Sequence, residues 1–272
     1  MSWLQIVVLA IVQGITEFLP ISSSGHLILV PHVTGWPDQG LAIDAASHLG
    51  TLAAVLIYFW RDVWRLVTGF FRLIGGRRDA SGQLDPWGRL AVYIIIGTIP
   101  VVIVGFLIDR YVGEGLRKLE IIAWTMPIFG IVLYLADRFG LTLKRLADLR
   151  LPHAVIIGCA QSLALIPGIS RSGITMVTAR LLNFERAEAA RFSFLLSIPA
   201  STAAGLLESY KIYEGGDVAV LHDAILIVLL TALAGLGAIA FLMAWLKRAT
   251  FTPFVIYRLL LGAALLYFVY FT

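Results

Sequence analysis

The segment QGITEFLPISSSG, residues 13–25, places polar and helix-breaking residues inside a stretch that is otherwise apolar from Leu4 onward. A second segment of the same kind, QSLALIPGISRSG, occupies residues 161–173. Aligned without gaps at an offset of 148 residues, the two share five identities, which in the first segment are Gln13, Ile21, Ser22, Ser24 and Gly25. Proline and glycine inside an apolar run disfavour a continuous helix, so each segment predicts a broken one.

The composition is that of an integral membrane protein. Of the 272 residues, 59% are hydrophobic and 14% are charged, whereas about 25% are charged in soluble domains. Apolar runs repeat along the whole chain with short polar connections, so we expect one polytopic domain. The net charge of +4 arises from arginines that flank apolar segments, which is typical of membrane orientation and does not indicate nucleic acid binding.

Six segments have the apolar character of membrane spans, although two of them are short. They are residues 41–60, 90–108, 121–136, 192–207, 224–246 and 254–271. Arginine-rich connections predict the cytoplasmic side at 61–89 and 137–153, as do Lys247, Arg248 and Arg258 near a third turn. The mainly acidic character of segment 208–217 predicts that it is external.

With the connections assigned to these sides, residues 1–40 and 154–182 each begin and end on one side of the membrane. Each segment therefore predicts a re-entrant helical hairpin. Each hairpin precedes three spans. The sequence therefore predicts an all-α polytopic membrane protein, with six spanning helices and two re-entrant hairpins arranged as an inverted-topology repeat. The first repeat covers about residues 1–136 and the second about residues 150–272 of the single domain. A chance match between two serine-rich segments is the alternative, because the flanking spans align poorly.

In an inverted repeat the two breaks converge near the middle of the membrane, so their polar side chains share one site. The residue types suit a phosphate. Arg171 offers a planar fork of N–H donors that matches phosphoryl oxygens. Hydroxyls, glycines and freed backbone N–H groups at helix N-termini add donors for an anion. These substrate-binding candidates are Ser22, Ser24, Gly25, Gly168, Ser170, Ser172, Gly173 and Thr175.

Glu17 is the carboxylate of the first break. Beside a phosphate it would be repelled unless it holds a divalent cation or acts as an acid or base. The serines supply a nucleophile, and His26 could transfer a proton near neutral pH. Other interpretations stay open: serines also let membrane helices pack closely, and Glu17 could form a structural ion pair with Arg171. Asp44 and His48, at the outer end of span 41–60, are interpreted as interfacial residues.

The motifs QGITEFLPISSSGH at residues 13–26 and PGISRSGIT at residues 167–175 resemble the two signature motifs of the bacterial undecaprenyl-pyrophosphate phosphatases, the bacitracin-resistance protein family. Their order, spacing and membrane layout are similar over essentially the full length. The resemblance implies a multi-pass enzyme of the bacterial inner membrane, with its active site facing the periplasm or cell exterior. Such an enzyme removes the terminal phosphate of undecaprenyl pyrophosphate, which recycles the lipid carrier for peptidoglycan synthesis. The resemblance also implies a divalent cation, Mg²⁺ or Ca²⁺.

Carried over by position, the resemblance implies that Ser23 is the nucleophile and Arg171 the phosphate clamp. His26 would be a proton-transfer residue, although it could attack in place of Ser23. Glu17 would be a metal-linked or acid–base carboxylate. The first motif of the family commonly begins with glutamate, and here that position is Gln13. An amide oxygen can still coordinate a cation but removes one negative charge, so Glu17 would be the only carboxylate ligand.

A lipid-phosphate flippase or transporter is the rival function, since inverted repeats with broken helices are the usual architecture of carriers. The serine-rich sequence near Glu17 favours the phosphatase, because a phosphatase needs a nucleophilic hydroxyl close to a base and a carrier does not. A channel is a weaker alternative, because no ring of charges is visible. The expected partners are undecaprenyl pyrophosphate and membrane lipids, and the sequence leaves a homodimer open.

Overall fold

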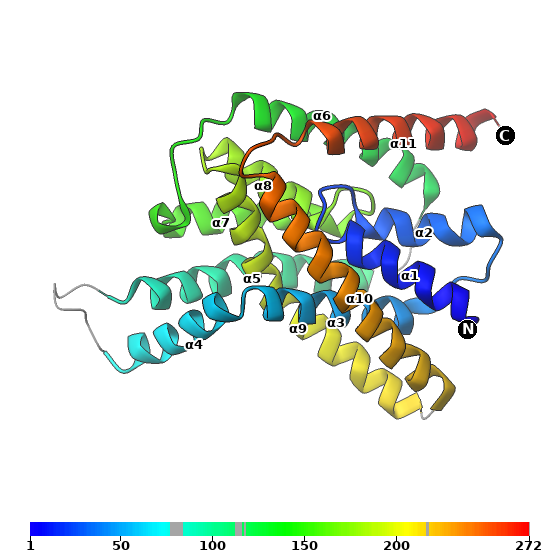
Figure 1. The fold of residues 1–272 in the computed structure, drawn as a ribbon, viewed down its shortest axis with the longest axis horizontal. Helices are drawn as coiled ribbons and strands as arrows, with labels where there is room; N and C mark the ends of the chain where they lie inside the picture. Colours follow the sequence, from blue (N-terminus) through cyan, green and yellow to red (C-terminus); the bar gives the residue numbers. More distant parts are fainter. Residues whose placement is uncertain (77–83, 112–115, 117, 216–217, 272) are drawn as a thin grey trace.

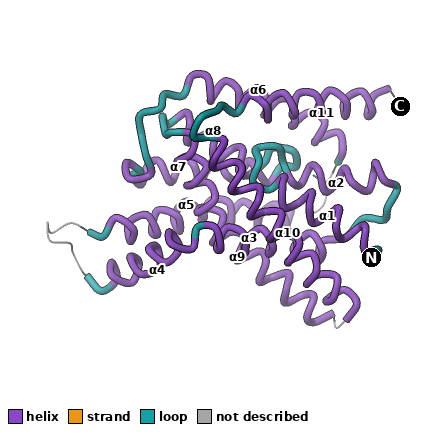
Figure 2. The backbone as a smooth tube through the Cα atoms, in the orientation of Figure 1, coloured by secondary structure: helices purple, strands orange, loops and turns teal. Residues whose placement is uncertain are grey.

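The computed structural model describes residues 1–271 except 77–83, 112–115, 117 and 216–217, and this part of the chain is helical, with no β-strand (Figures 1 and 2). The predicted all-α class is confirmed. The elements in chain order are α1 (Trp3–Thr16), α2 (Ser23–Thr34), α3 (Gly40–Tyr58), α4 (Trp60–Ile74), α5 (Pro86–Tyr111), α6 (Leu119–Phe139), the short 3₁₀ helix η2 (Leu146–Asp148), α7 (Leu151–Gln161), η3 (Ser162–Leu165), α8 (Arg171–Leu181), α9 (Arg186–Gly215), α10 (Val218–Trp245) and α11 (Thr252–Phe271).

Within the described residues, four helices are long and apolar enough to cross a bilayer, which makes the chain a multi-pass membrane protein. They are α5, α6, α10 from Leu221 onward, and α11. The predicted spans 90–108, 121–136, 224–246 and 254–271 coincide with these helices. The predicted span 41–60 is α3, which passes the same test only together with α4, across a bend of 83°. The predicted span 192–207 lies inside α9, which is not among the four helices found in the described residues.

The acidic segment 208–217, which the sequence predicts to be external, is helical over most of its length. Helix α9 continues through Gly215, and only residues 216–217 lie outside the described part of the chain. The prediction of an external position rests on the charge of the segment. Charged residues such as glutamate and lysine are good helix formers, so a polar segment can extend a helix as readily as end it.

The two breaks meet between the packed helices. Helix α10 packs against α3 and α1, α5 packs against α4 and α7, and α6 lies alongside α11 (Figure 1). In the first break Phe18 is 1% exposed and meets Phe194 of α9 edge-on, with ring centroids 5.3 Å apart. From the second break, the Ser172 hydroxyl donates to the backbone oxygen of Glu17 at 2.9 Å. This contact joins segments that are 155 residues apart in sequence.

The helices that follow the two breaks begin in the same way. Ser22 is the N-cap of α2 and Ser170 is the N-cap of α8, and their φ angles are 74° and 75°. Each hydroxyl accepts from the glycine N–H three residues on, at 3.4 Å from Gly25 and 3.1 Å from Gly173. A positive φ is uncommon for a residue with a side chain, and such conformations cluster at functional sites. One local pattern therefore builds both breaks.

Arg258 is a buried cation that holds both breaks. The prediction that it marks a cytoplasmic turn is wrong, because Arg258 lies well inside α11 and is 1% exposed. Its guanidinium donates to five backbone oxygens, those of Pro20, Thr125, Met126, Gly168 and Ile169. Broken helices leave carbonyls without intrahelical partners, and the five N–H groups of an arginine can satisfy them.

Candidate active site

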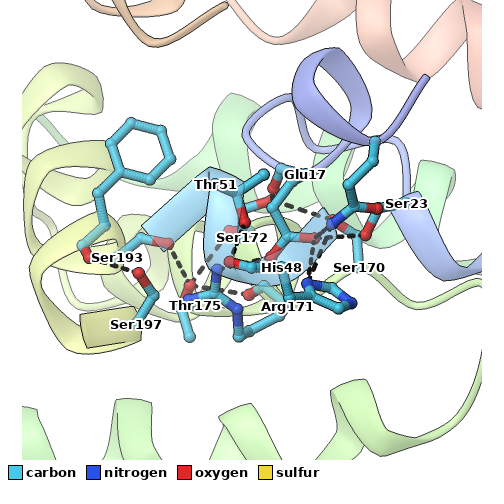
Figure 3. Close-up of polar contacts among 12 residues, drawn as sticks. Glu17, Ser23, His48, Thr51, Ser170, Arg171, Ser172, Thr175, Ser193 and Ser197 are labelled. Carbon is cyan, nitrogen blue, oxygen red and sulfur yellow. Dashed lines mark hydrogen bonds and ion pairs between the residues drawn. The ribbon is translucent and has the colours of Figure 1, made fainter. Parts of the chain in front are cut away.

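The Glu17 carboxylate lies at the centre of a hydrogen-bond cluster formed by both breaks (Figure 3). Its Oε2 accepts from the Ser23 hydroxyl at 2.5 Å and from Nε2 of Gln13 at 3.1 Å. Its Oε1 accepts from Nη2 of Arg171 at 2.8 Å. Glu17 is 7% exposed, so this carboxylate depends on these partners rather than on water. The sequence predicts that these four side chains share a site, and the structure brings all four together.

Ser23 and Arg171 hold equivalent places in the two breaks. Each is the first residue of its helix, α2 or α8, directly after the N-cap serine, and they are related by the offset of 148 residues. The N-terminus of a helix carries unpaired N–H groups and the positive end of the helix dipole. The first side chains of two such helices therefore contact the Glu17 carboxylate, and helix N-termini favour a phosphate.

Arg171 keeps donors for a ligand. Its Nη2 is bonded to Glu17, whereas its Nη1 is buried and has no hydrogen-bond partner within the described residues. The side chain as a whole is 19% exposed. An unpaired buried donor is costly unless something else satisfies it, and an arginine fork is well suited to phosphoryl oxygens. Arg171 can therefore bind an anion while it remains paired with Glu17.

Several predicted substrate-binding hydroxyls are engaged with the protein itself. Ser22 and Ser170 cap their helices, using the N–H groups of Gly25 and Gly173, and their hydroxyls lie 3.3 and 3.2 Å from those of Ser24 and Ser172. Gly168 has a φ of 89°, and its carbonyl oxygen accepts a hydrogen bond from Nη2 of Arg258. The Thr175 hydroxyl donates to the Arg171 backbone at 2.9 Å and lies 2.6 Å from the Ser193 hydroxyl. These groups position the two helix N-termini, and Thr175 holds the backbone of the residue that carries the free guanidinium nitrogen.

His26 is bonded away from the Glu17 cluster. Its Nδ1 lies 2.6 Å from the backbone oxygen of Ser22 and its Nε2 lies 2.5 Å from the hydroxyl of Tyr257. The His26 and Tyr257 rings are also stacked, with centroids 5.7 Å apart. Within the described residues, no hydrogen bond joins His26 to Glu17, Ser23 or Arg171. Sequence reasoning did not find Tyr257, because this tyrosine belongs to α11, 231 residues away.

His48 of α3 is the second residue that sequence reasoning missed. The sequence favours an interfacial position for it, but its Nδ1 lies 3.0 Å from Nε2 of Gln13 and 3.6 Å from Oε2 of Glu17. Its side chain is 38% exposed, so it lies at the rim of the cluster. The available signal was that an ionisable side chain inside an apolar span is functional by default.

The same cluster offers oxygen ligands for a divalent cation. Oε1 of Gln13 is buried and has no hydrogen-bond partner among the described residues, and Glu17 lies one helical turn further on. The described residues contain no group of three or more histidine, cysteine, aspartate or glutamate side chains that could form a complete protein cage. Mg²⁺ is often bound by one or two carboxylates together with substrate phosphates and waters. The residues therefore fit a cation that is shared with a phosphorylated ligand.

Chemically, the site combines a hydroxyl, a carboxylate acceptor for its proton and a guanidinium donor. The Ser23 hydroxyl already donates to Glu17, which is the arrangement that a nucleophile and its base require. Arg171, bonded to the other carboxylate oxygen, adds a positively charged donor beside the Ser23–Glu17 pair. The arrangement can bind a phosphate and transfer it to an oxygen nucleophile.

Comparison with known proteins points the same way. Residues 6–264 match the family model described as bacitracin resistance protein BacA. The chain is 47% identical over 271 residues to the undecaprenyl-diphosphatase of Ruegeria sp. (strain TM1040), covering 99% of this chain and 100% of that protein. It is 47% identical to undecaprenyl-diphosphatase 1 of Rhodospirillum rubrum, covering 99% and 96% of the two chains. It is 49% identical to the undecaprenyl-diphosphatase of Desulforudis audaxviator over 94% of each chain.

Proposed function

The chain belongs to the bacitracin resistance protein BacA family, and we propose that it is an undecaprenyl-diphosphatase. It hydrolyses the terminal phosphate of undecaprenyl pyrophosphate, giving undecaprenyl phosphate and inorganic phosphate. This reaction recycles the lipid carrier for peptidoglycan synthesis and confers bacitracin resistance. The observation that supports the assignment most strongly is the Glu17 carboxylate, which bridges Ser23 of one break and Arg171 of the other.

Ser23 is the nucleophile in this proposal. Its Oγ forms a bond to the terminal phosphorus while its proton passes to Oε2 of Glu17, 2.5 Å away. The bond from this phosphorus to the bridging oxygen breaks, and undecaprenyl phosphate leaves with the electron pair. Water then attacks the phosphorus of the phosphoserine, and the bond from phosphorus to Oγ breaks as Glu17 returns its proton to Oγ. Inorganic phosphate departs as H₂PO₄⁻, with both protons of that water. Arg171 offers Nη1 to the charge that develops on the phosphoryl oxygens.

His26 is less well placed for attack. Its ring nitrogens are engaged by the Ser22 backbone and by Tyr257, so neither is free to reach phosphorus without first losing a hydrogen bond. We infer that His26 fixes the first turn of α2, and with it the direction of Ser23. Tyr257 couples this turn to α11.

Gln13 and Glu17 are the residues that would hold a divalent cation, Mg²⁺ or Ca²⁺. The unpaired Oε1 of Gln13 supports this proposal, since amide and carboxylate oxygens are the ligands that these cations prefer. When bound, the cation supplies positive charge that counters the charge on the phosphate oxygens. Gln13 also donates from Nε2 to Glu17, which keeps the carboxylate in place beside Ser23.

The finer topology is part of the same proposal. We propose six spanning helices, with α1–α2 and α7–η3–α8 as two re-entrant hairpins of an inverted-topology repeat that covers the whole chain as one domain. The shared cap geometry of Ser22 and Ser170 supports a repeat. So does the packing of α1 on α10 and of α7 on α5, which pairs the corresponding elements of the two halves. The arginine-rich connections support an inner-membrane location with the site open to the periplasm or cell exterior.

This placement explains why polar residues lie at membrane depth, because the anionic head of the substrate must be bound where its polyprenyl tail stays in lipid. A flippase would need phosphate donors but no contact between a hydroxyl and a carboxylate. The Ser23–Glu17 hydrogen bond therefore favours the phosphatase over the carrier.

Phosphate release from undecaprenyl pyrophosphate by purified protein in detergent tests the proposal, because detergent removes the two compartments that transport requires. Ser23→Ala should abolish release in the presence of Mg²⁺ or Ca²⁺. Thr34→Val, which removes an exposed hydroxyl from the other end of α2, should leave it unchanged. Wild-type protein that is folded, supplied with metal and still releases no phosphate would contradict the assignment.

A further inference from the structure

We propose that His48 is a positioning residue that fixes the amide of Gln13 with its oxygen free for the divalent cation. This inference rests on the proposed function, which needs a cation beside the bound pyrophosphate. It concerns the orientation of one side chain by another and assigns no proton transfer to His48.

The Glu17 carboxylate favours one orientation of the Gln13 amide, with the nitrogen toward Oε2. Nε2 has two hydrogens and two acceptors within reach, Oε2 of Glu17 at 3.1 Å and Nδ1 of His48 at 3.0 Å. For Nδ1 to accept, the proton of the neutral imidazole is on its other nitrogen, Nε2. With both hydrogens used, Oε1 of Gln13 is left as a buried acceptor that no described residue satisfies.

The reversed amide is unfavourable. Exchanging Nε2 and Oε1 would place the amide oxygen 3.1 Å from the Glu17 carboxylate oxygen, so that two acceptors would face each other. His48 supports the same choice from its own side, because Nδ1 needs a donor when the ring proton is on Nε2. Glu17 and His48 together therefore hold the amide nitrogen away from the cation and leave the oxygen for it.

This orienting partner matters because Gln13 is an amide. A carboxylate presents an oxygen whichever way it turns, whereas an amide presents an oxygen in only one of two orientations and a repelling N–H group in the other. Groups that orient the ligands of a metal typically change its affinity by about 10- to 100-fold when they are removed. His48 is 38% exposed, so it can be replaced without emptying the core.

The test measures Mn²⁺ binding to the purified full-length chain in detergent by electron paramagnetic resonance, with Mn²⁺ as a stand-in for Mg²⁺. His48→Leu removes the acceptor and should raise the Kd for Mn²⁺ by about 10- to 100-fold. His48→Asn keeps an acceptor near the position of Nδ1 and should bind within about threefold of wild type.

A second background separates positioning from general damage. In Gln13→Glu protein no amide needs orienting, so adding His48→Leu should change the Kd for Mn²⁺ by less than about threefold. The proposal is overturned if His48→Leu binds like wild type, if His48→Asn is as weak as His48→Leu, if the Leu substitution is equally damaging in the Gln13→Glu background, or if wild type binds no Mn²⁺. Phosphate release by the same wild-type sample reports on the proposed function separately, so the two can fail independently.

Discussion

The Glu17–Arg171 ion pair should contribute to both stability and activity, and a double variant that removes both charges should recover only the stability. Glu17 is 7% exposed, the Arg171 side chain is 19% exposed, and their closest atoms are 2.8 Å apart. Two unit charges about 4 Å apart attract by about 4 kcal/mol at an effective dielectric constant of about 20. Arg171→Met leaves the Glu17 charge buried without this partner. We expect a loss of about 3 kcal/mol, the low end for broken buried pairs, because Arg171 is partly exposed.

Adding Glu17→Gln to Arg171→Met removes the stranded charge, so the double variant should regain most of the lost stability. It should not regain activity. Loss of a preorganised donor costs about 10²- to 10³-fold in rate, and loss of a general base costs about 10²- to 10⁴-fold. Every variant in the cycle should therefore be severely impaired, including the one that melts near wild type.

Stability is measured as the melting midpoint of each variant in detergent, determined by size-exclusion chromatography of heated samples. Activity is measured as phosphate release. A loss of about 3 kcal/mol should lower the midpoint by about 6–12 °C in Arg171→Met. If Arg171→Met melts like wild type, the pair does not stabilise the fold. If the double variant hydrolyses substrate at the wild-type rate, Glu17 and Arg171 are structural residues and the mechanism is wrong.

Two further changes test the fold around the site. Arg258→Met should abolish folded protein, because it leaves buried carbonyls unsatisfied at about 1–3 kcal/mol each. Arg145→Met, which removes an exposed ion pair, should leave the yield of monodisperse protein in detergent unchanged. A normal yield of Arg258→Met would show that Arg258 does not hold the two breaks together. Gly14→Ala should lower the melting midpoint, since the added Cβ would lie 2.6 Å from the Cβ of Ala234. Gly237→Ala should not, because there is open space around the added Cβ. Equal melting midpoints for the two variants would contradict the close packing of α1 on α10.

Local sequence chemistry is enough to predict the centre of the site. Pro20 and Gly168 break apolar helices whatever the surrounding fold, and the serine that follows each break caps the next helix. Because the two breaks share this pattern, the sequence also predicts that Glu17 and Arg171 belong to one site. The structure places their oxygen and nitrogen atoms in direct contact.

Contacts between distant helices cannot be predicted in the same way. His48 and Tyr257 reach Gln13 and His26 from helices that are 35 and 231 residues away, and no local pattern specifies such pairings. Arg258 is misplaced by sequence reasoning because counting charges along the chain does not distinguish a cation at a helix flank from one that binds backbone carbonyls inside the bundle.

The most direct test of the central claim is to locate the phosphate on the enzyme during turnover. Wild-type protein would be mixed with undecaprenyl pyrophosphate for less than one turnover, quenched in both acid and alkali to preserve phosphoserine and phosphohistidine, and mapped by mass spectrometry. The account predicts phosphate on Ser23, increased when hydrolysis is slowed and absent from Ser23→Ala protein. Phosphate on His26 would contradict it, as would full turnover with no phosphorylated residue in either quench.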